Sequence, residues 1–193
     1  MSNQSNPDAI NRELCYPLRM SSSAESCSIC LQSKAPLHCE QCQGALCKEC
    51  AQHLAEDTFA FLKKVPAELL HRTYCMTCYG QHVEPALESY NEVLERAKQV
   101  FVFYKSQRKA IPLTGRSKII MRVEENHDRD ETILRLAFFA AEQSFNAIID
   151  VDVTSEKVRN GSYQTSKWKG SGFPASIDTV KLDKQYAQDQ IYR

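Results

Sequence analysis

Long apolar runs are missing from this 193-residue chain, which has no stretch of about 18 apolar residues that would span a bilayer. Its first 26 residues are polar and lack the apolar run of a signal peptide. An excess of one charge is missing too, because 24 Lys and Arg balance 24 Asp and Glu. Without a basic stripe, neither nucleic acid nor an anionic membrane is an expected partner. These absences predict a cytoplasmic protein that does not bind nucleic acid.

Signatures of common catalysts are also missing. The sequence contains no HExxH motif, no phosphate-binding loop and no nucleophile–base pair at a supporting spacing. It does have an ordinary globular composition, with 42% hydrophobic and 25% charged residues, and is long enough to bury a core without disulfides. We therefore expect one or two folded domains, and we favour a non-catalytic role over an enzymatic one.

Cysteine is abundant, and eight of the nine cysteines occur as Cys-x-x-Cys pairs. The pairs are Cys27/Cys30, Cys39/Cys42, Cys47/Cys50 and Cys75/Cys78. A Cys-x-x-Cys turn points two thiolates at one ion, and two such pairs complete the tetrahedral four-sulfur site of structural zinc. In a reducing compartment, paired cysteines are more often metal ligands than disulfides. The sequence thus predicts two Zn²⁺ per chain and leaves Cys15 as a free thiol.

The spacer between Cys42 and Cys47 bears on which pairs share an ion. It contains only four residues, which is short for a boundary between two independent zinc knuckles and favours an interleaved arrangement. Site one then consists of Cys27, Cys30, Cys47 and Cys50, and site two of Cys39, Cys42, Cys75 and Cys78. Sequential pairing is the alternative. An iron–sulfur cluster is disfavoured because the close cysteine run of ferredoxins is absent.

The order of the pairs, and the gap in Cys39-x-x-Cys42-x4-Cys47-x-x-Cys50, resemble the FYVE zinc finger of the RING/FYVE/PHD cross-brace group. The resemblance covers residues 27–78 and implies a two-zinc finger. FYVE domains bind phosphoinositide head groups through a basic motif around the third cysteine. Here only His38 matches that motif, and Glu40 carries the opposite charge. The scaffold therefore carries over, whereas membrane phosphoinositide binding, which would use Lys34, His38 and Arg72, is disfavoured.

RING ubiquitin ligases belong to the same group and supply an alternative function. They usually place a His among the middle ligands, with a shorter gap there, whereas all eight predicted ligands here are cysteines. Ile29, between Cys27 and Cys30, resembles the apolar partner-docking position of RING domains, or else it packs the turn. We therefore favour a zinc-binding interaction or scaffold protein, with a RING-type ubiquitin ligase as the alternative.

The residues between the third and fourth pairs are rich in apolar side chains: Leu54, Phe59, Phe61, Leu62, Val65, Leu69 and Leu70. Short helices are expected to start at Asp57 or Thr58 and at Pro66. This segment is predicted to form a small apolar core over the metals or, alternatively, a groove for a partner.

Residues 79–109 are predicted to form a helical linker. Pro85 suits its first turn, and apolar residues follow at spacings of four and three: Leu87, Tyr90, Leu94, Ala97, Phe101 and Tyr104. This seam either packs on its own domain or forms a homodimer. The β-branched and aromatic run over residues 100–104 also suits a strand.

Residues 110–182 are predicted to fold as a small α+β domain with an antiparallel sheet, between a disordered segment over 1–26 and a tail over 183–193. Strands are expected over 118–123, 147–153, 163–170 and 175–182. A helix capped by Asp128 or Asp130 should run to about Ser144. The dipeptide Asn160-Gly161 favours a hairpin turn.

The order strand, helix, hairpin, with the stretches 146–151 and 168–172, resembles dodecin-like domains and the small α+β domains ascribed to bacterial heavy-metal binding. Those domains assemble by extending sheets, which implies a protein partner or a homo-oligomer for this chain. Asp150 and Asp152 are two apart on a strand and so share one face. They form either a metal-binding or catalytic pair or part of a solvated sheet face.

Overall fold

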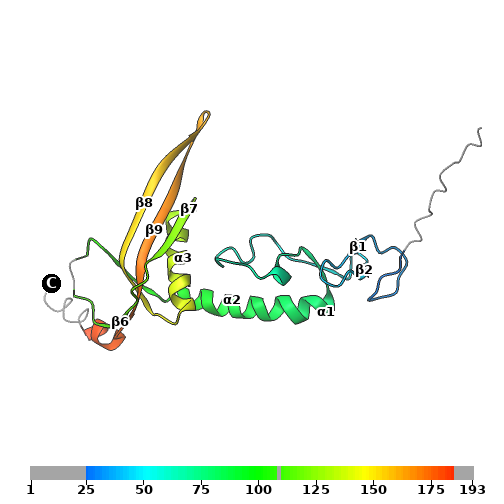
Figure 1. The fold of residues 1–193 in the computed structure, drawn as a ribbon, viewed down its shortest axis with the longest axis horizontal. Helices are drawn as coiled ribbons and strands as arrows, with labels where there is room; N and C mark the ends of the chain where they lie inside the picture. The colour runs from blue at the N-terminus through cyan, green and yellow to red at the C-terminus, as the bar shows by residue number, and fades with distance from the viewer. Residues whose placement is uncertain (1–24, 108–109, 185–193) are drawn as a thin grey trace, which may run out of the picture.

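The computed structural model describes residues 25–107 and 110–184, and the predictions for the N-terminal segment, for Cys15 and for the end of the tail lie outside them. In these residues the chain is a mixed α and β protein in two parts joined by a long helix (Figure 1). Residues 25–78 are called the cysteine module below, and residues 101–184 the α+β unit.

The cysteine module contains little regular secondary structure. Two short antiparallel pairs form, β1 (Leu37–His38) with β2 (Ala45–Leu46) and β3 (Ala51–His53) with β4 (Thr73–Cys75). Residues 51–74, called the insert below, contain the short 3-10 helix η1 (Ala67–Leu69), which starts after Pro66 as predicted. The other predicted helix start is wrong: residues 56–61 form turns, in which the Thr58 hydroxyl donates to the Ala55 carbonyl.

The insert shares an apolar core with the cysteines. Leu54, Phe59 and Leu69 are buried in the same cluster as five of the sulfur-bearing residues, Cys27, Cys39, Cys47, Cys75 and Cys78. The predicted apolar core beside the cysteines is therefore confirmed.

A continuous helical stretch leads from the last cysteine pair into the α+β unit. It consists of α1 (Met76–Cys78), the π-helical turn η2 (Tyr79–Val83) and α2 (Glu84–Ala97). Pro85 has no N–H to donate to the preceding turn, which accounts for the wider turn before it. The helix predicted over 79–109 is therefore too long: it stops at Ala97, and the β-branched and aromatic residues that follow form a strand.

The apolar seam of α2 is used inside the chain. Leu87 packs on the core of the cysteine module, Leu94 and Ala97 belong to the core of the α+β unit, and Tyr90 contacts both. The intramolecular alternative for this seam is therefore the one observed.

The α+β unit is built on a five-stranded sheet. Its strands are β5 (Phe101–Tyr104), β6 (Leu113–Arg116), β7 (Met121–Asn126), β8 (Ala147–Asn160) and β9 (Tyr163–Ile177). β8 pairs with one edge of β9, while β6 and β7 pair with β9 at different heights. The predicted antiparallel pairing is found between β9 and each of β6, β7 and β8, and β5 adds one parallel pairing with β8. The chain between these two strands is long enough for the crossover that parallel pairing needs.

Two of the predicted strand boundaries are also corrected. The strand expected over 118–123 begins only at Met121, and β6 lies before it. The strand expected over 175–182 is divided: its first three residues complete β9, and residues 179–184 are helical.

Helix α3 (Arg129–Glu142) covers one face of the sheet and begins where predicted. The Asp128 carboxylate caps it by accepting a hydrogen bond from the Glu131 N–H at 2.8 Å. The helix lies close to β9 because Gly170 has no side chain: a Cβ there would come within 2.7 Å of the Thr132 methyl group. Leu136, fully buried, also contacts this position.

A bulge in β8 divides the apolar residues between two faces. Asp150 has a φ of 54° and is the extra residue between Ile149 and Asp152. As a result Ile148 and Val151, three apart, both pack in the core under α3, while Ile149 belongs to a smaller cluster.

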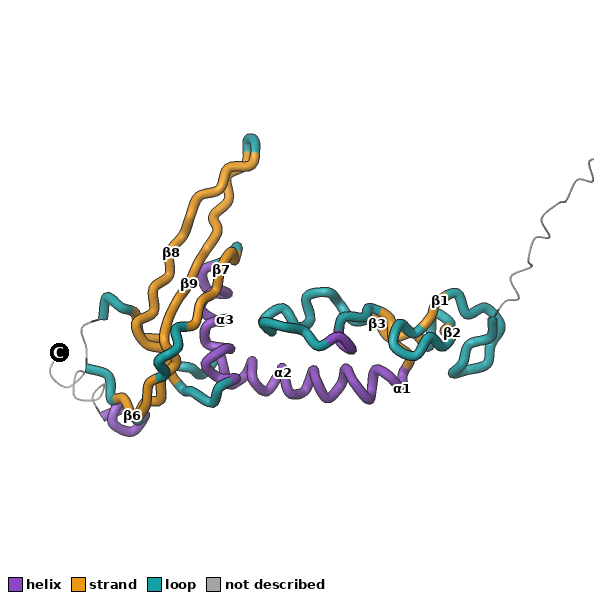
Figure 2. Tube along the Cα trace, viewed as in Figure 1, coloured by secondary structure: helices purple, strands orange, loops and turns teal. Residues whose placement is uncertain are grey.

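The β8–β9 hairpin continues beyond the rest of the sheet as a two-stranded ribbon (Figure 1). Its turn contains Gly161 with a φ of 61°, so the hairpin predicted from Asn160-Gly161 is confirmed. The insert, in contrast, runs from the cysteine module back along α2 toward α3 (Figure 2).

Candidate metal centre

The eight paired cysteines lie in two separate clusters of four. In one cluster the sulfurs of Cys27, Cys30, Cys47 and Cys50 all lie within 4.8 Å of one another, and in the other those of Cys39, Cys42, Cys75 and Cys78 do so. The first pair thus meets the third and the second meets the fourth, which is the grouping of the interleaved arrangement. Both clusters could hold a metal ion.

The sulfur separations fit a tetrahedral centre. The Sγ atoms of Cys30 and Cys47 are 3.7 Å apart, and those of Cys42 and Cys75 are 3.9 Å apart. Four sulfurs at about 2.3 Å from a central ion would lie about 3.8 Å from one another. The separations therefore suit one metal ion per cluster, bound only by thiolates.

Local backbone geometry aims the sulfurs. The first two Cys-x-x-Cys turns each end in a left-handed residue, Leu31 with a φ of 61° and Gln43 with a φ of 63°. These turns close through hydrogen bonds from Leu31 N–H to the Cys27 carbonyl and from Gln43 N–H to the Cys39 carbonyl. The last pair instead starts a helix, where Cys75 Sγ accepts the Cys78 N–H at 3.3 Å.

Backbone hydrogen bonds favour the thiolate form at one cysteine of each cluster. The N–H groups of Cys30 and Cys47 lower the pKa of Cys27 to about 6. Burial raises the pKa of Cys39, but the N–H groups of Cys42 and Cys75 outweigh it and bring the value to about 7. Thiolates are the form in which cysteine binds metal.

Close packing of the thiols raises the pKa of other cysteines in the clusters. The neighbouring Cys47 thiol and burial raise the pKa of Cys50 to about 12. Burial and the adjacent Cys75 thiol raise the pKa of Cys78. Four sulfurs in such a space can all ionise only if a cation compensates their charge. The clusters are therefore matched to a metal cation.

The residues predicted for a lipid motif lie outside both clusters. His38 Nε2 is 3.3 Å from a Glu25 carboxylate oxygen, and Arg72 forms an ion pair with Glu56. His71 Nδ1 lies 3.6 Å from a Glu40 carboxylate oxygen. Each of these basic side chains thus has an acidic neighbour.

The two aspartates of β8 do not form a pair. Asp150 lies in the bulge and accepts a hydrogen bond of 2.9 Å from Arg116, while Asp152 lines a hollow to which Asp150 does not contribute. Among residues 25–107 and 110–184, the cysteine quartets are the only groups whose ligand atoms gather closely enough for a metal. Both aspartates are exposed to solvent.

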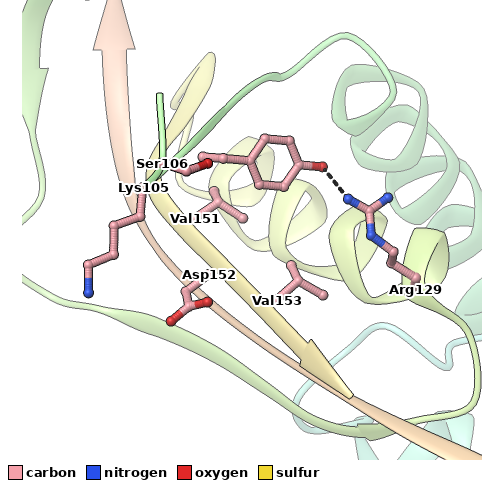
Figure 3. A pocket seen from close by; sticks show the side chains of 7 residues that line it. Lys105, Ser106, Arg129, Val151, Asp152 and Val153 are labelled. Atoms are coloured by element: carbon pink, nitrogen blue, oxygen red, sulfur yellow. Dashed lines mark hydrogen bonds between the residues drawn. The ribbon is translucent and has the colours of Figure 1, made fainter. Parts of the chain in front are cut away.

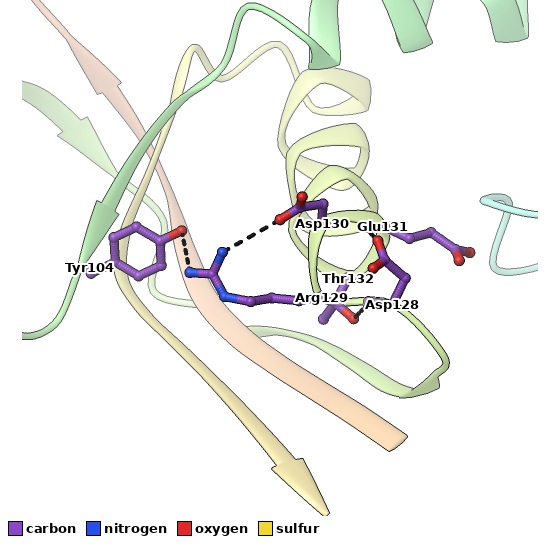
Figure 4. Close-up of polar contacts among 6 residues, drawn as sticks. All are labelled: Tyr104, Asp128, Arg129, Asp130, Glu131 and Thr132. Carbon is purple, nitrogen blue, oxygen red and sulfur yellow. Dashed lines mark hydrogen bonds and ion pairs between the residues drawn. The ribbon is translucent and has the colours of Figure 1, made fainter. Parts of the chain in front are cut away.

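Asp152 lines a hollow of about 380 Å³ where β5 ends beside β8 and the start of α3 (Figure 3). Its wall also includes Tyr104 and Lys105, together with Arg129, whose guanidinium donates to the Tyr104 hydroxyl at 3.2 Å. Figure 4 shows Arg129 held between this hydroxyl and Asp130 at the N-terminal turn of α3. The Tyr104–Arg129 contact joins residues far apart in the chain, and sequence reasoning gave no sign of it.

A smaller groove of about 210 Å³ lies on the insert. Leu54, Phe59, Val65 and Leu69 contribute to its lining, and Leu70 is 66% exposed. It lies in the segment for which a partner groove was the alternative prediction.

Comparisons with family models, with curated proteins and with solved structures find no match to this chain. None of the helices in the part of the chain that the structure describes combines the length and apolar character needed to cross a membrane. The two cysteine clusters are therefore the feature of this chain that indicates a function.

Proposed function

We propose that this chain is a zinc-binding, non-catalytic interaction protein in which residues 27–78 form a FYVE-like cross-brace finger with two Zn²⁺ ions. The observation that carries the proposal is the pair of four-sulfur clusters with tetrahedral spacing. A site with four protein ligands leaves no position for water or substrate, so its metal is structural. Each ion would contribute on the order of 10 kcal/mol to folding.

The β8–β9 ribbon supports the interaction role. β5 pairs with β8 only as far as Val151, and β7 pairs with β9 only as far as Trp168. In the described residues, the ribbon beyond these points therefore has no strand beside it on either edge. Open strand edges pair readily with another chain. A protein partner or a second copy of this chain is the ligand class that such edges suit.

The charge pattern supports a protein partner over a phosphoinositide. His38 and Arg72, two of the residues a lipid head group would need, already face Glu25 and Glu56. A phosphate group would have to displace these carboxylates or lie beside them, and like charges repel.

A RING-type ubiquitin ligase is the second candidate, and the exposure of Ile29 favours it. This side chain, between two ligands of site one, is 40% exposed rather than packed under the turn. An autoubiquitination assay with several conjugating enzymes tests the candidate. Activity that disappears in Ile29→Ala would establish it, and no turnover with any conjugating enzyme leaves the non-catalytic role.

Native mass spectrometry of the freshly purified full chain tests the main proposal, because it reports metal count and subunit number together. We expect two zinc ions per chain and a mass above that of the monomer. One metal or none would contradict the two-site finger, and a strictly monomeric protein would remove the second copy as the partner.

Paired Cys→Ser substitutions make the same measurement specific for the interleaved arrangement. The double variant Cys27→Ser, Cys47→Ser removes two ligands of site one and should keep one ion. The matched double variant Cys27→Ser, Cys39→Ser damages both sites and should keep none. Sequential pairing predicts the reverse result, so this comparison separates the two arrangements.

A further inference from the structure

Each end of the insert is joined directly to a residue of one of the two cysteine clusters. The insert starts directly after Cys50 of site one and ends directly before Cys75 of site two. The short β3–β4 pair brings the ends together, with Ala51 opposite Cys75 and His53 opposite Thr73. The cysteine clusters therefore fix the positions of both ends of the insert.

Between its ends, the insert has little structure of its own. It contains one three-residue 3-10 helix and a series of turns closed by short-range bonds, such as Leu62 N–H to the Phe59 carbonyl. A segment of this kind keeps its conformation only through what holds its ends and what it packs against.

The tip of the insert packs on α3 of the α+β unit. The ring of Phe61 meets that of Phe138 edge to face, with centroids 5.7 Å apart. The guanidinium of Arg135 lies 5.0 Å from the Phe61 ring, and the ammonium of Lys63 lies 4.5 Å from the Phe139 ring. Phe138 and Phe139 are only 1% and 7% exposed in this arrangement.

Tyr90 of α2 completes the connection. Its ring contacts Phe59 of the insert at 5.4 Å and Phe138 of α3 at 5.2 Å. Leu62 and Tyr90 each pack on the core of the cysteine module and on the core of the α+β unit. A run of side chains therefore leads from the cysteine clusters to α3. The covalent link between the same two parts is the helix α2, which Figure 2 shows below the insert.

We propose that the insert is a metal-dependent cover: metal in the two cysteine clusters holds it on α3, and metal loss releases it and uncovers the aromatic surface at Tyr90, Phe138 and Phe139. Without metal, the ends of the insert separate, and a few aromatic and cation–π contacts do not offset the conformational entropy of the 24 residues between Cys50 and Cys75. The state of the metal sites is thereby transmitted to the α+β unit. This inference rests on the proposed function, since it requires that the clusters bind metal.

Hydroxyl-radical footprinting of the full chain, read by mass spectrometry, tests this proposal. On removal of zinc with a chelator, oxidation of Phe138 and Phe139, which are 1% and 7% exposed, should rise to the level of a solvent-exposed phenylalanine, as expected for local opening. Oxidation of Met121 and Val123, which lie on β7 in the core between the sheet and α3, should stay the same. If zinc is lost and oxidation of Phe138 does not change, the cover is excluded, although the zinc-binding function stands. If no zinc is present at the start, the proposed function itself fails.

The variant Phe61→Ala separates the cover from metal binding. It should keep both zinc ions by native mass spectrometry and still raise oxidation of Phe138, because only the tip contact is removed. Phe61→Leu retains an apolar tip and should restore protection. The matched control Phe101→Ala removes an aromatic ring of β5 that does not contact the insert, and should leave Phe138 protected. Full protection of Phe138 in Phe61→Ala would overturn the proposal.

Discussion

The strands of the cysteine module are two or three residues long, whereas β8 and β9 of the α+β unit have 14 and 15 residues. The buried clusters differ in the same way. Five of the core residues in the cysteine module are cysteines. The larger of the two buried clusters in the α+β unit consists of aliphatic and aromatic residues such as Leu136, Phe138 and Ile148. The two parts therefore depend on different forces.

This difference is the one expected if metal ions bound by the two cysteine quartets fix the cysteine module. Strands of two or three residues contribute few backbone hydrogen bonds, and small domains with so little regular structure commonly obtain their stability from metal, which the two quartets could bind. The α+β unit buries a helix face against a sheet and needs no such help. Substitutions in the core of one part should thus leave the other part folded, while the surface at Phe138 still responds to the insert that covers it.

The largest effect expected from a single substitution in the α+β unit is that of Leu136→Ala. The Leu136 side chain is fully buried, so truncating it leaves a cavity that lowers the free energy of unfolding by about 2–5 kcal/mol. Urea unfolding measures this change, and the zinc content should remain at the wild-type value. The surface control Ile119→Ala, at a side chain that is 75% exposed, should change stability by no more than about 0.5 kcal/mol. Zinc loss in Leu136→Ala would show that the two parts are not separable.

A smaller loss is expected where α3 approaches β9. The variant Gly170→Ala places a methyl group within 2.7 Å of the Thr132 methyl and 3.1 Å of a Leu136 methyl, and overpacking of this kind lowers the free energy of unfolding by about 1–3 kcal/mol. In the matched control Gly115→Ala the nearest atom, on Ser176, is 3.8 Å away, so little strain should result. Equal stability of the two variants would contradict the close helix–sheet approach.

A still smaller loss in the free energy of unfolding is expected when the N-cap of α3 is removed. Asp128→Ala removes the acceptor for the Glu131 N–H and should lower the free energy of unfolding by about 1 kcal/mol. Asp128→Asn keeps a capping oxygen and should recover most of this loss. Thermal unfolding followed by circular dichroism measures both variants, and an Asn variant as unstable as the Ala variant would argue against the cap.

The smallest expected effect is a pH dependence at the contact between the two parts. Burial raises the pKa of the Tyr90 hydroxyl above its ordinary value of 10.0, against an opposing contribution from the Phe61 backbone N–H. The neutral phenol is thus favoured in the folded chain, and its stabilising contribution is fully present below pH 10 and lost as the pH rises through the higher folded-state pKa. Unfolding measured between pH 9 and 11 should show this loss, and Tyr90→Phe should reduce it. An identical pH profile in both proteins would contradict the assignment.

Local signals made part of this structure predictable. Asp128 marked the start of α3 and Asn160-Gly161 marked the hairpin, because each depends on residues close in sequence. The grouping of the eight sulfurs joins pairs that are far apart in the chain, and it was inferred from the short spacer between Cys42 and Cys47. The heptad spacing continues past the end of the helix, since Phe101 and Tyr104 match it by position and yet belong to a strand.

The features that were not predicted depend on residues distant in sequence. The parallel pairing of β5 with β8 and the bulge at Asp150 follow from how the strands meet, and no local pattern encodes them. The contact of Phe61 with Phe138 joins residues of both parts, and the sequence marked Phe61 only as one apolar residue among several.

If the proposed function is right, metal bound by sulfur holds the cysteine module in shape, and the α+β unit folds without it. Hydrogen exchange of the full chain before and after chelation tests this claim most directly, because it reports on both parts in one sample. The account predicts that amides of residues 27–78 lose their protection on chelation, while those in the β8–β9 pairing over residues 147–153 and 170–175 keep theirs. Unchanged protection of residues 27–78 in the metal-free protein would contradict it.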